Sequence, residues 1–305
     1  MTNEAPVLVA VIGLGSMGLG IANSITRRQI PVAGFDLDPG AMASLARIGR
    51  AATSAADAAK DCDIAVVVVV NAAQTRTVLF GEGAVARAMK PGGVIVSCAT
   101  MAPDDARALA RDAEALGLLY LDAPISGGAA KANDGQLTVM ASGRPAAFAF
   151  ARPALDAMAE KVYELGDEAG VGASFKMVNQ LLAGVHIAAA SEALTFAAKL
   201  GLDLRKVYEV ITASAGNSWM FENRGTHILD GDYRPRSAVS IFTKDLGIVS
   251  DMARKEKFPL QIASTALQLF LMTAAAGMER DDDASVARMI ATVTGVALPT
   301  ARTEG

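Results

Sequence analysis

The stretch Val7-Leu-Val-Ala-Val-Ile12-Gly13-Leu-Gly15-Ser-Met-Gly18 decides the fold of this 305-residue chain. An apolar run of strand length leads directly into a G-x-G-x-x-G loop, and a segment with helical periodicity, Met17–Arg28, follows. A second apolar run, Pro31–Phe35, ends at Asp36. A strand, a glycine loop, a helix and a second strand that ends in an acidic residue are typical of a dinucleotide-binding unit.

The glycine loop and Asp36 together predict the cofactor. The chain contains 28 glycines and will produce near-matches by chance, so the flanking strand and helix carry the prediction. The Asp36 carboxylate would accept hydrogen bonds from the adenosine ribose and repel a 2′-phosphate, and no arginine follows it. We therefore expect NAD rather than NADP. The loop residues expected to bind it are Gly13, Leu14, Gly15, Ser16, Met17 and Gly18.

Apolar runs of strand length continue through the first half of the chain and alternate with helix-length segments such as Pro103–Leu116. The runs are Val7–Ile12, Pro31–Phe35, Ile64–Val70, Val94–Val96, Leu118–Leu121 and Leu137–Ala141. Strands that are apolar on both faces indicate a parallel sheet covered by helices on both sides. We expect an α/β protein whose residues 1–167 form an NAD-binding, Rossmann-type doubly wound sheet.

Strand patterns nearly vanish after the glycine-rich break at residues 166–172, and residues 168–305 are predicted to form an all-helical substrate and oligomerisation domain. A helical pattern runs from Ser174 to about Lys199, and Gly201 ends it. This segment is expected to be a long interdomain helix. Further helices are expected at Asp203–Ser214, Ser237–Lys255 and Leu260–Met278.

Composition excludes several classes of function. The 28 Lys+Arg against 32 Asp+Glu leave no basic surplus for nucleic acid or a membrane surface. Two isolated cysteines and two histidines form no cluster with metal-ligand spacing, so we expect no metal. Although 52% of the residues are hydrophobic, the longest aliphatic run, Ile64–Val70, is far too short to span a bilayer. The N-terminal residues 1–6 show no signal-peptide pattern, and we expect a cytoplasmic protein.

Two polar segments are candidates for the reaction site. The segment Asp122–Gly128 follows an apolar run, and its Ser126-Gly127-Gly128 would expose consecutive backbone N–H groups suited to a carboxylate, although such a sequence is also a common turn. On the long helix, Lys176, Asn179 and Gln180 have the i, i+3, i+4 spacing that places them on one face. A lysine near a helix start often only extends to solvent, but the neighbouring amides favour a buried polar site.

These motifs, in their order and spacing, resemble those of the β-hydroxyacid dehydrogenase family from about Val9 to Pro299. The matching segments are Gly13–Gly18 with Asp36, Asp122–Gly128, Gly172–Gln180 and Lys244-Asp245-Leu246. The resemblance implies that Lys176 is the catalytic acid/base and Asn179 a substrate-positioning amide. It implies that Ser126, Gly127 and Gly128 bind the substrate carboxylate, and that Asn71, Thr100 and Lys244 contact the cofactor.

One departure from the family concerns Gln180, because the family usually has two asparagines at positions 179 and 180. The stretches around His186, from Ala215 to Arg224 and from Phe242 to Gly247 resemble the L-threonate dehydrogenase branch, which carries the same glutamine and histidine. This resemblance implies oxidation of L-threonate at C2 to 2-dehydro-L-erythronate. Gln180, Asn217 and Ser218 would then bind substrate hydroxyls, although Asn217 and Ser218 would equally suit a helix cap before Trp219.

Several alternatives stay open at this point. On the same scaffold they are 3-hydroxyisobutyrate dehydrogenase, tartronate semialdehyde reductase and imine reductase activity, and Lys176 argues against the last. A non-catalytic dinucleotide-sensing module is a further alternative, against which the presence of Lys176 and Asn179 also argues. The apolar helices of the second half favour a homodimer or homotetramer.

Overall fold

The computed structural model describes residues 7–81 and 85–301. The chain divides into two compact units, Met1–Lys176 (the N-terminal unit) and Met177–Gly305 (the C-terminal unit). The expectation that no signal sequence is present concerns residues 1–6, which lie outside the described residues.

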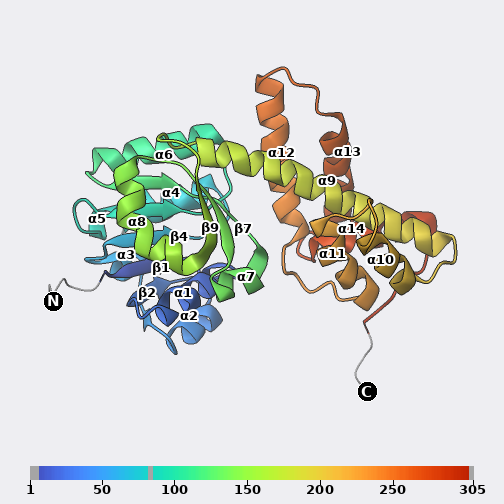
Figure 1. Cartoon of the computed structure of the whole chain (residues 1–305), viewed down its shortest axis with the longest axis horizontal. Coiled ribbons are helices and arrows are strands. Elements are labelled where there is room, and N and C mark those ends of the chain that lie inside the picture. Colours follow the sequence, from blue (N-terminus) through green and yellow to red (C-terminus); the bar gives the residue numbers. More distant parts are fainter. Residues whose placement is uncertain (1–6, 82–84, 302–305) are drawn as a thin grey trace. The chain divides into compact units, whose positions relative to one another are not determined.

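A six-stranded parallel sheet forms the centre of the N-terminal unit, with strand order β3-β2-β1-β4-β5-β6 (Figure 1). The strands are β1 (Val9–Ile12), β2 (Val32–Phe35), β3 (Arg50–Ala51), β4 (Ile64–Val67), β5 (Val94–Ser97) and β6 (Leu119–Asp122). The strand order reverses between β1 and β4, and ligands of such sheets bind at the carboxyl ends of the strands beside this reversal. The predicted doubly wound fold is confirmed.

Helices cover both faces of this sheet, as its apolar strands require. Val9 and Val11 of β1 pack into the core on one face, and Ala10 and Ile12 pack into the core on the other. The first face is covered by α1 (Gly18–Arg27), α2 (Pro39–Leu45), α7 (Gly128–Asp134) and α8 (Pro145–Met158). The second face is covered by α3 (Ala55–Ala59), α4 (Ala72–Phe80), α5 (Val85–Ala88) and α6 (Pro103–Ala115).

A second, three-stranded sheet completes the N-terminal unit. Its central strand β8 (Leu137–Ala141) pairs antiparallel with β7 (Ile125–Ser126) and parallel with β9 (Ala159–Glu164). Asp122 at the end of β6 forms an isolated bridge with Ser142 just after β8. Only β8 has the apolar run that predicts a strand, since β7 has two residues and β9 is an exposed, largely polar edge.

The helix α9 (Val171–Lys199) is continuous from the N-terminal unit into the C-terminal unit. It begins three residues before the predicted start at Ser174. The remaining helices are α10 (Leu204–Thr212), α11 (Trp219–Asp230), α12 (Val239–Lys255), α13 (Gln261–Thr273) and α14 (Val286–Thr294). Within residues 177–301, the structure contains helices, turns and loops but no strand longer than an isolated bridge.

The C-terminal unit has two apolar cores. Ile187 of α9, Phe242 of α12 and Phe270 of α13 lie in the first, where the two aromatic rings stack with centroids 5.1 Å apart. The second contains Leu194 and Phe221. The predicted helix Leu260–Met278 ends as an α-helix at Thr273 and continues as a π-helical turn, Ala274–Met278, because Gly277 adopts a φ of +86°.

Two helical segments are long and apolar enough to cross a membrane by length and composition, Val171–Lys199 and Gln261–Met278. The most apolar stretch of the first is 50% buried inside the fold, and that of the second is 22% buried. Core helices of folded proteins have the same length and composition, so these two segments are weak evidence for a membrane.

Candidate functional site

The glycine loop between β1 and α1 has the geometry that its sequence predicts. Gly13 has a φ of +90°, and a Cβ there would lie 2.3 Å from the carbonyl oxygen of Val68. A Cβ on Gly18 would lie 1.8 Å from the carbonyl oxygen of Gly13, so only glycine lets the helix start this close to the strand. A Cβ on Gly15 would meet no atom within 4 Å. The loop therefore leaves open space at Gly15, where a ligand can approach the backbone.

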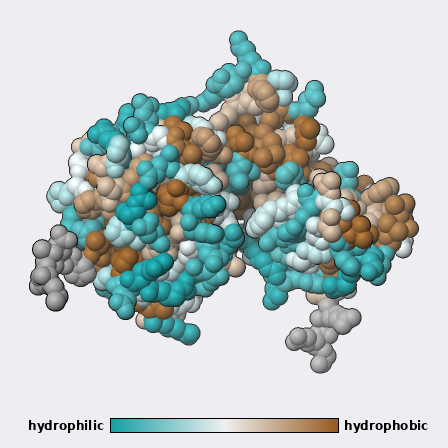
Figure 2. All heavy atoms as spheres, viewed as in Figure 1, coloured by the Kyte–Doolittle hydropathy of each residue, from teal (hydrophilic) through white to brown (hydrophobic). Residues whose placement is uncertain are grey.

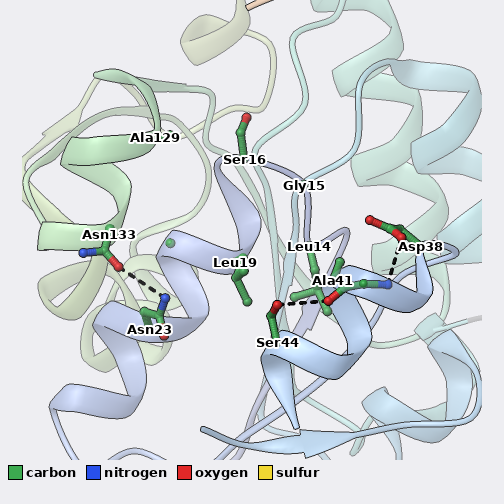
Figure 3. A pocket seen from close by; sticks show the side chains of 12 residues that line it. Leu14, Gly15, Ser16, Leu19, Asn23, Asp38, Ala41, Ser44, Ala129 and Asn133 are labelled. Carbon is green, nitrogen blue, oxygen red and sulfur yellow. Dashed lines mark hydrogen bonds between the residues drawn. The ribbon is translucent and has the colours of Figure 1, made fainter. Parts of the chain in front are cut away.

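A cleft of about 490 Å³ opens beside this loop, a volume in the range of small-molecule sites. Figure 3 shows Gly15 and Ser16 between two helices that line the cleft. Asn133 on α7 lines one side, and Ser44 on α2 lines the other. The Asn23 side chain donates to the Asn133 side chain at 3.2 Å and joins α1 to α7. The cleft, the open Gly15 and the helix N-terminus fit the pyrophosphate end of a dinucleotide.

Asp36 ties the end of β2 to the glycine loop. Its Oδ2 accepts the backbone N–H of Leu14 at 2.5 Å, and its Oδ1 accepts that of Asp38 at 2.8 Å. An ionised carboxylate offers about four acceptor positions, so both oxygens can still accept ribose hydroxyls. A second carboxylate, that of Asp38, caps α2 through the N–H of Gly40 and lines the same cleft. The lining of the cleft contains Asp38 and no arginine, and Asp36 bonds to Leu14 of that lining. This arrangement fits NAD and disfavours a 2′-phosphate.

Asn71 and Thr100 follow β4 and β5, the strands that continue the sheet from β1. Asn71 caps α4, since its Oδ1 accepts the N–H of Gln74 at 2.8 Å. Thr100 is half-buried. Both residues lie at the carboxyl-terminal edge of the sheet, the edge to which the glycine loop also belongs.

Lys176 lies buried near the start of α9, with 6% of its surface exposed. Its Nζ donates a hydrogen bond of 2.8 Å to the carbonyl oxygen of Ile125. Ile125 lies 51 residues before Lys176 along the chain and directly precedes Ser126, so the structure brings the amine to the segment Ser126–Gly128. The amine does not extend to bulk water.

The segment Ser126–Gly128 turns from β7 into α7. Gly127 and Gly128 have φ values of +139° and +80°, which side chains rarely adopt. Gly127 is the N-cap residue of α7 and offers no side-chain cap to the first N–H groups of that helix. Backbone N–H groups in this arrangement suit an anion such as a carboxylate.

Asn179 and Gln180 belong to a network within the C-terminal unit. The Nδ2 of Asn179 donates to the Oε1 of Gln180 at 3.0 Å, and the Nε2 of Gln180 donates to the Oδ2 of Asp245 at 2.5 Å. The other oxygen of Asp245 forms an ion pair with the Nζ of Lys244 at 2.8 Å. Gln180 and Asp245 are buried, with 7% and 1% exposed. The network therefore joins a proposed substrate amide to a proposed cofactor contact.

Asn217 and Ser218 hold the connection between α10 and α11. Asn217 donates through Nδ2 to the carbonyl oxygen of Thr212 and to Glu222, and the Oγ of Ser218 accepts the N–H of Phe221 at 3.0 Å. The capping role that the sequence left open for Ser218 is therefore present. The Oδ1 of Asn217 is buried and has no hydrogen-bond partner among the described residues.

Sequence reasoning assigned no role to two buried carboxylates that the structure places in these networks. Asp122 bonds to the first turn of α9, and Asp245 bonds to Gln180. Both residues stood within the quoted motifs, and a carboxylate inside an otherwise apolar segment was the available signal.

Two family descriptions match successive parts of the chain. Residues 8–166 match the NAD-binding domain of 6-phosphogluconate dehydrogenase. Residues 170–290 match the family described as NAD-binding of NADP-dependent 3-hydroxyisobutyrate dehydrogenase.

Individual relatives match over nearly the full length. The L-threonate dehydrogenase of Haemophilus influenzae is 50% identical over 95% of this chain and 96% of its own length. A crystal structure of a 3-hydroxyisobutyrate dehydrogenase from Salmonella typhimurium has a TM-score of 0.90 at 50% identity, covering 93% of this chain and 99% of that one. The Mycobacterium tuberculosis 3-hydroxyisobutyrate dehydrogenase, solved with L-serine, has a TM-score of 0.80 at 28% identity, covering 94% and 99%.

Proposed function

Because this chain belongs to the β-hydroxyacid dehydrogenase family, we propose that it oxidises L-threonate at C2 to 2-dehydro-L-erythronate with NAD as the acceptor. The observation that carries the proposal is the buried Lys176 amine beside Ser126–Gly128. The L-threonate dehydrogenases of Haemophilus influenzae and of Escherichia coli K12, at 50% and 48% identity, support the choice of substrate.

The cofactor would be held mainly by the N-terminal unit, with Lys244 of the C-terminal unit as a further proposed contact. The pyrophosphate would lie on Gly13–Gly18, the adenosine ribose on Asp36, and the nicotinamide end near Asn71, Thr100 and Lys244. When bound, NAD accepts a hydride from the carbinol carbon of the substrate. The protein contributes orientation and the handling of the proton.

Lys176 would take the proton of the substrate hydroxyl at Nζ. The amine must be neutral before it can act as this base, and its burial keeps competing water away. The carbonyl of Ile125 accepts one N–H of the amine and thereby fixes the direction of Nζ.

The substrate would be held by groups that suit a hydroxylated acid. The backbone N–H groups of Ser126, Gly127 and Gly128 would bind the carboxylate. Asn179 donates through Nδ2 to Gln180, which leaves its Oδ1 to accept a substrate hydroxyl. We propose that Gln180, Asn217 and Ser218 bind the remaining hydroxyls, and the buried Asn217 Oδ1 without a partner among the described residues supports this role.

The second candidate substrate is 3-hydroxyisobutyrate, because the similar Salmonella protein is described as a 3-hydroxyisobutyrate dehydrogenase. That acid has one hydroxyl group, so it would not engage all of the groups that we propose for L-threonate, among them the buried Oδ1 of Asn217. Sites built to bond several hydroxyls reject analogues that lack them, by up to about 10⁴-fold. We therefore expect L-threonate to be preferred.

A panel of acids tests this function. The purified protein is supplied with NAD and, in separate reactions, with L-threonate, D-threonate, erythronate, 3-hydroxyisobutyrate and glycerate, and NADH absorbance is followed. We expect L-threonate to give the highest kcat/KM. Preferred oxidation of 3-hydroxyisobutyrate would move the assignment to the second candidate, and binding of NAD without turnover of any acid would favour a dinucleotide sensor.

We further propose that residues 1–167 and 168–305 are the cofactor and substrate domains of a cytoplasmic homodimer or homotetramer. Figure 2 shows apolar side chains gathered on the surface over α12 and α13. In α13, Ile262 is 72% exposed, and Leu271 and Met272 are more than two-fifths exposed. A contiguous exposed apolar patch marks an interface. Light scattering should show an oligomer that Ile262→Lys weakens, and a monomeric wild type would contradict this assignment.

A further inference from the structure

The carboxylate of Asp122 binds the first turn of α9. Asp122 is the last residue of β6 and is 1% exposed. Its Oδ2 accepts the backbone N–H of Gly170 at 2.9 Å and that of Ala173 at 2.8 Å. Beside it, the Oγ of Ser142 accepts the N–H of Gly172 at 2.9 Å. The N–H groups of Gly172 and Ala173 in the first turn of this helix are therefore satisfied by side chains at the end of β6 and just after β8.

These contacts differ from an ordinary helix cap, because the acceptor is distant in sequence. A usual N-cap side chain bonds to N–H groups two or three residues further on, whereas Asp122 lies 48 and 51 residues before its two partners. The packing is close as well, since a Cβ on Gly172 would lie 2.3 Å from the carbonyl oxygen of Met140. The helix start is thus attached to β6 and β8 rather than to its own loop.

The same short segment also holds Lys176. Ile125, whose carbonyl accepts the Lys176 amine, comes three residues after Asp122. Ala173, whose N–H binds Asp122, comes three residues before Lys176 and so lies one helical turn away from it. The segment Asp122–Ile125 therefore contacts α9 at two consecutive turns, at its start through a carboxylate and at Lys176 through a carbonyl.

A charge at this position is costly for folding. Burial raises the pKa of Asp122 to about 6, although the helix N–H groups, Ser142 and the nearby Arg107 of α6 all favour its ionised form. Burial raises the pKa of the neighbouring Cys98 thiol to about 12 and also raises the pKa of Tyr120. Both groups are therefore neutral, and neither is an ionic partner for the carboxylate. A neutral side chain would give a more stable fold at neutral pH, so stability alone does not account for a carboxylate here.

We propose that Asp122 is a positioning residue, whose carboxylate fixes the first turn of α9 on β6 and so keeps the Lys176 amine at the segment Ser126–Gly128. Hydrogen bonds to an ionised acceptor are roughly twice as strong as neutral ones, which suits a contact that must hold a reacting group in place. The proposal rests on the proposed function for one point only, the role of Lys176 in proton transfer.

The test compares Asp122→Ala and Asp122→Asn with the wild type and with Asp63→Ala. Asp63 is a matched control, because its carboxylate also accepts a backbone N–H in the N-terminal unit, that of Leu8 at 2.8 Å. Amide hydrogen exchange of residues 170–176, kcat, KM and the Kd for NAD are measured for each variant. Hydrogen exchange reports on the helix start without reference to any substrate.

We expect Asp122→Ala to accelerate exchange at Gly170 and Ala173 at least about tenfold and to lower kcat by roughly tenfold to a hundredfold, as for other small displacements of a reacting group. Asp122→Asn should have smaller effects in the same direction, because it retains a neutral acceptor. The Kd for NAD should be unchanged in both variants, and Asp63→Ala should change neither the exchange of residues 170–176 nor kcat.

Unchanged exchange at residues 170–176 in Asp122→Ala would overturn the attachment of the helix. Faster exchange with an unchanged kcat would overturn the positioning role. If the wild type oxidises another acid of the panel instead of L-threonate, the proposed substrate fails, and the same comparison on that acid decides the role of Asp122.

Discussion

The Nε2 of Gln180 donates a 2.5 Å hydrogen bond to the carboxylate of Asp245, 65 residues further along the chain. The Oε1 of the same amide accepts from Asn179, so this one side chain spans the distance between Asn179 and Asp245. The structure therefore gives a reason for glutamine, rather than the family's usual asparagine, at position 180. An asparagine, shorter by one methylene, would not reach both partners at once.

The first prediction concerns the bridge that the Gln180 side chain forms between Asn179 and Asp245. Gln180→Asn should free the Asn179 amide to rotate and leave one face of the buried Asp245 without its donor. We expect KM for L-threonate to rise about tenfold, the equivalent of one lost hydrogen bond, while the Kd for NAD stays unchanged. Steady-state kinetics and NAD titration check this, and an unchanged KM would show that the network does not orient Asn179.

Cofactor choice should depend on Asp36. Asp36→Ala removes the acceptor of the ribose hydroxyls and the repulsion of a 2′-phosphate, so the preference for NAD over NADP in kcat/KM should fall at least about tenfold. Because Asp36 also bonds to the N–H of Leu14, Asp36→Asn serves as the control that retains an acceptor. An undiminished preference for NAD in the alanine variant would contradict the cofactor assignment.

Stability should depend on pH through Asp122. Its pKa is about 6 in the fold against an ordinary 3.8, so the fold favours the protonated form. The contribution of this group to stability is present below about pH 4 and is lost as the pH rises through about 6, a change of roughly 3 kcal/mol. Asp122→Asn carries no titrating group at this position, so its stability relative to the wild type should rise between about pH 4 and pH 7 and level off above that. Urea unfolding measures the difference, and a constant difference would contradict the buried charge.

The C-terminal unit should depend on a buried ion pair. Arg224 makes two hydrogen bonds to Asp283, of 2.5 and 2.9 Å, and Asp283 is fully buried. Asp283→Ala would leave the guanidinium buried without its partner and should lower the free energy of unfolding by about 3–5 kcal/mol. Asp251→Ala, which breaks an exposed pair with Arg254, should have no measurable effect. Thermal unfolding of the two variants checks this prediction. An equal decrease in Tm for Asp283→Ala and Asp251→Ala would contradict it.

Local patterns predicted the long helix and every strand of the central sheet except β3, whose two residues are exposed and form no apolar run. The run Leu137–Ala141, expected in the same sheet, forms β8 of the second sheet instead. The runs that became β1, β4 and β5 are apolar on both faces because helices cover both sides, and this reason is visible in the sequence. The strand β9 was missed because its side chains are mostly exposed and polar. The true start of α9 was missed because its first N–H groups are satisfied by Asp122, not by a local cap.

The sequence predicted which residues belong to the candidate site, but not which hydrogen bonds those residues make. Lys176, Asn179 and Gln180 were recognisable from their spacing on one helix and from the family resemblance. Their partners Ile125 and Asp245 lie 51 and 65 residues away, so no local pattern indicates those bonds. Tertiary packing determines which buried carboxylate meets which donor, and only the structure shows it.

The central claim, that Lys176 transfers the proton in L-threonate oxidation, is tested most directly by Lys176→Met. Methionine fills a similar volume without an amine, so the helix should pack as before and the Kd for NAD should be retained. We predict that the rate of NADH formation from saturating L-threonate falls by about 10²–10⁴-fold. A variant that binds NAD and turns over L-threonate at the wild-type rate would contradict the account.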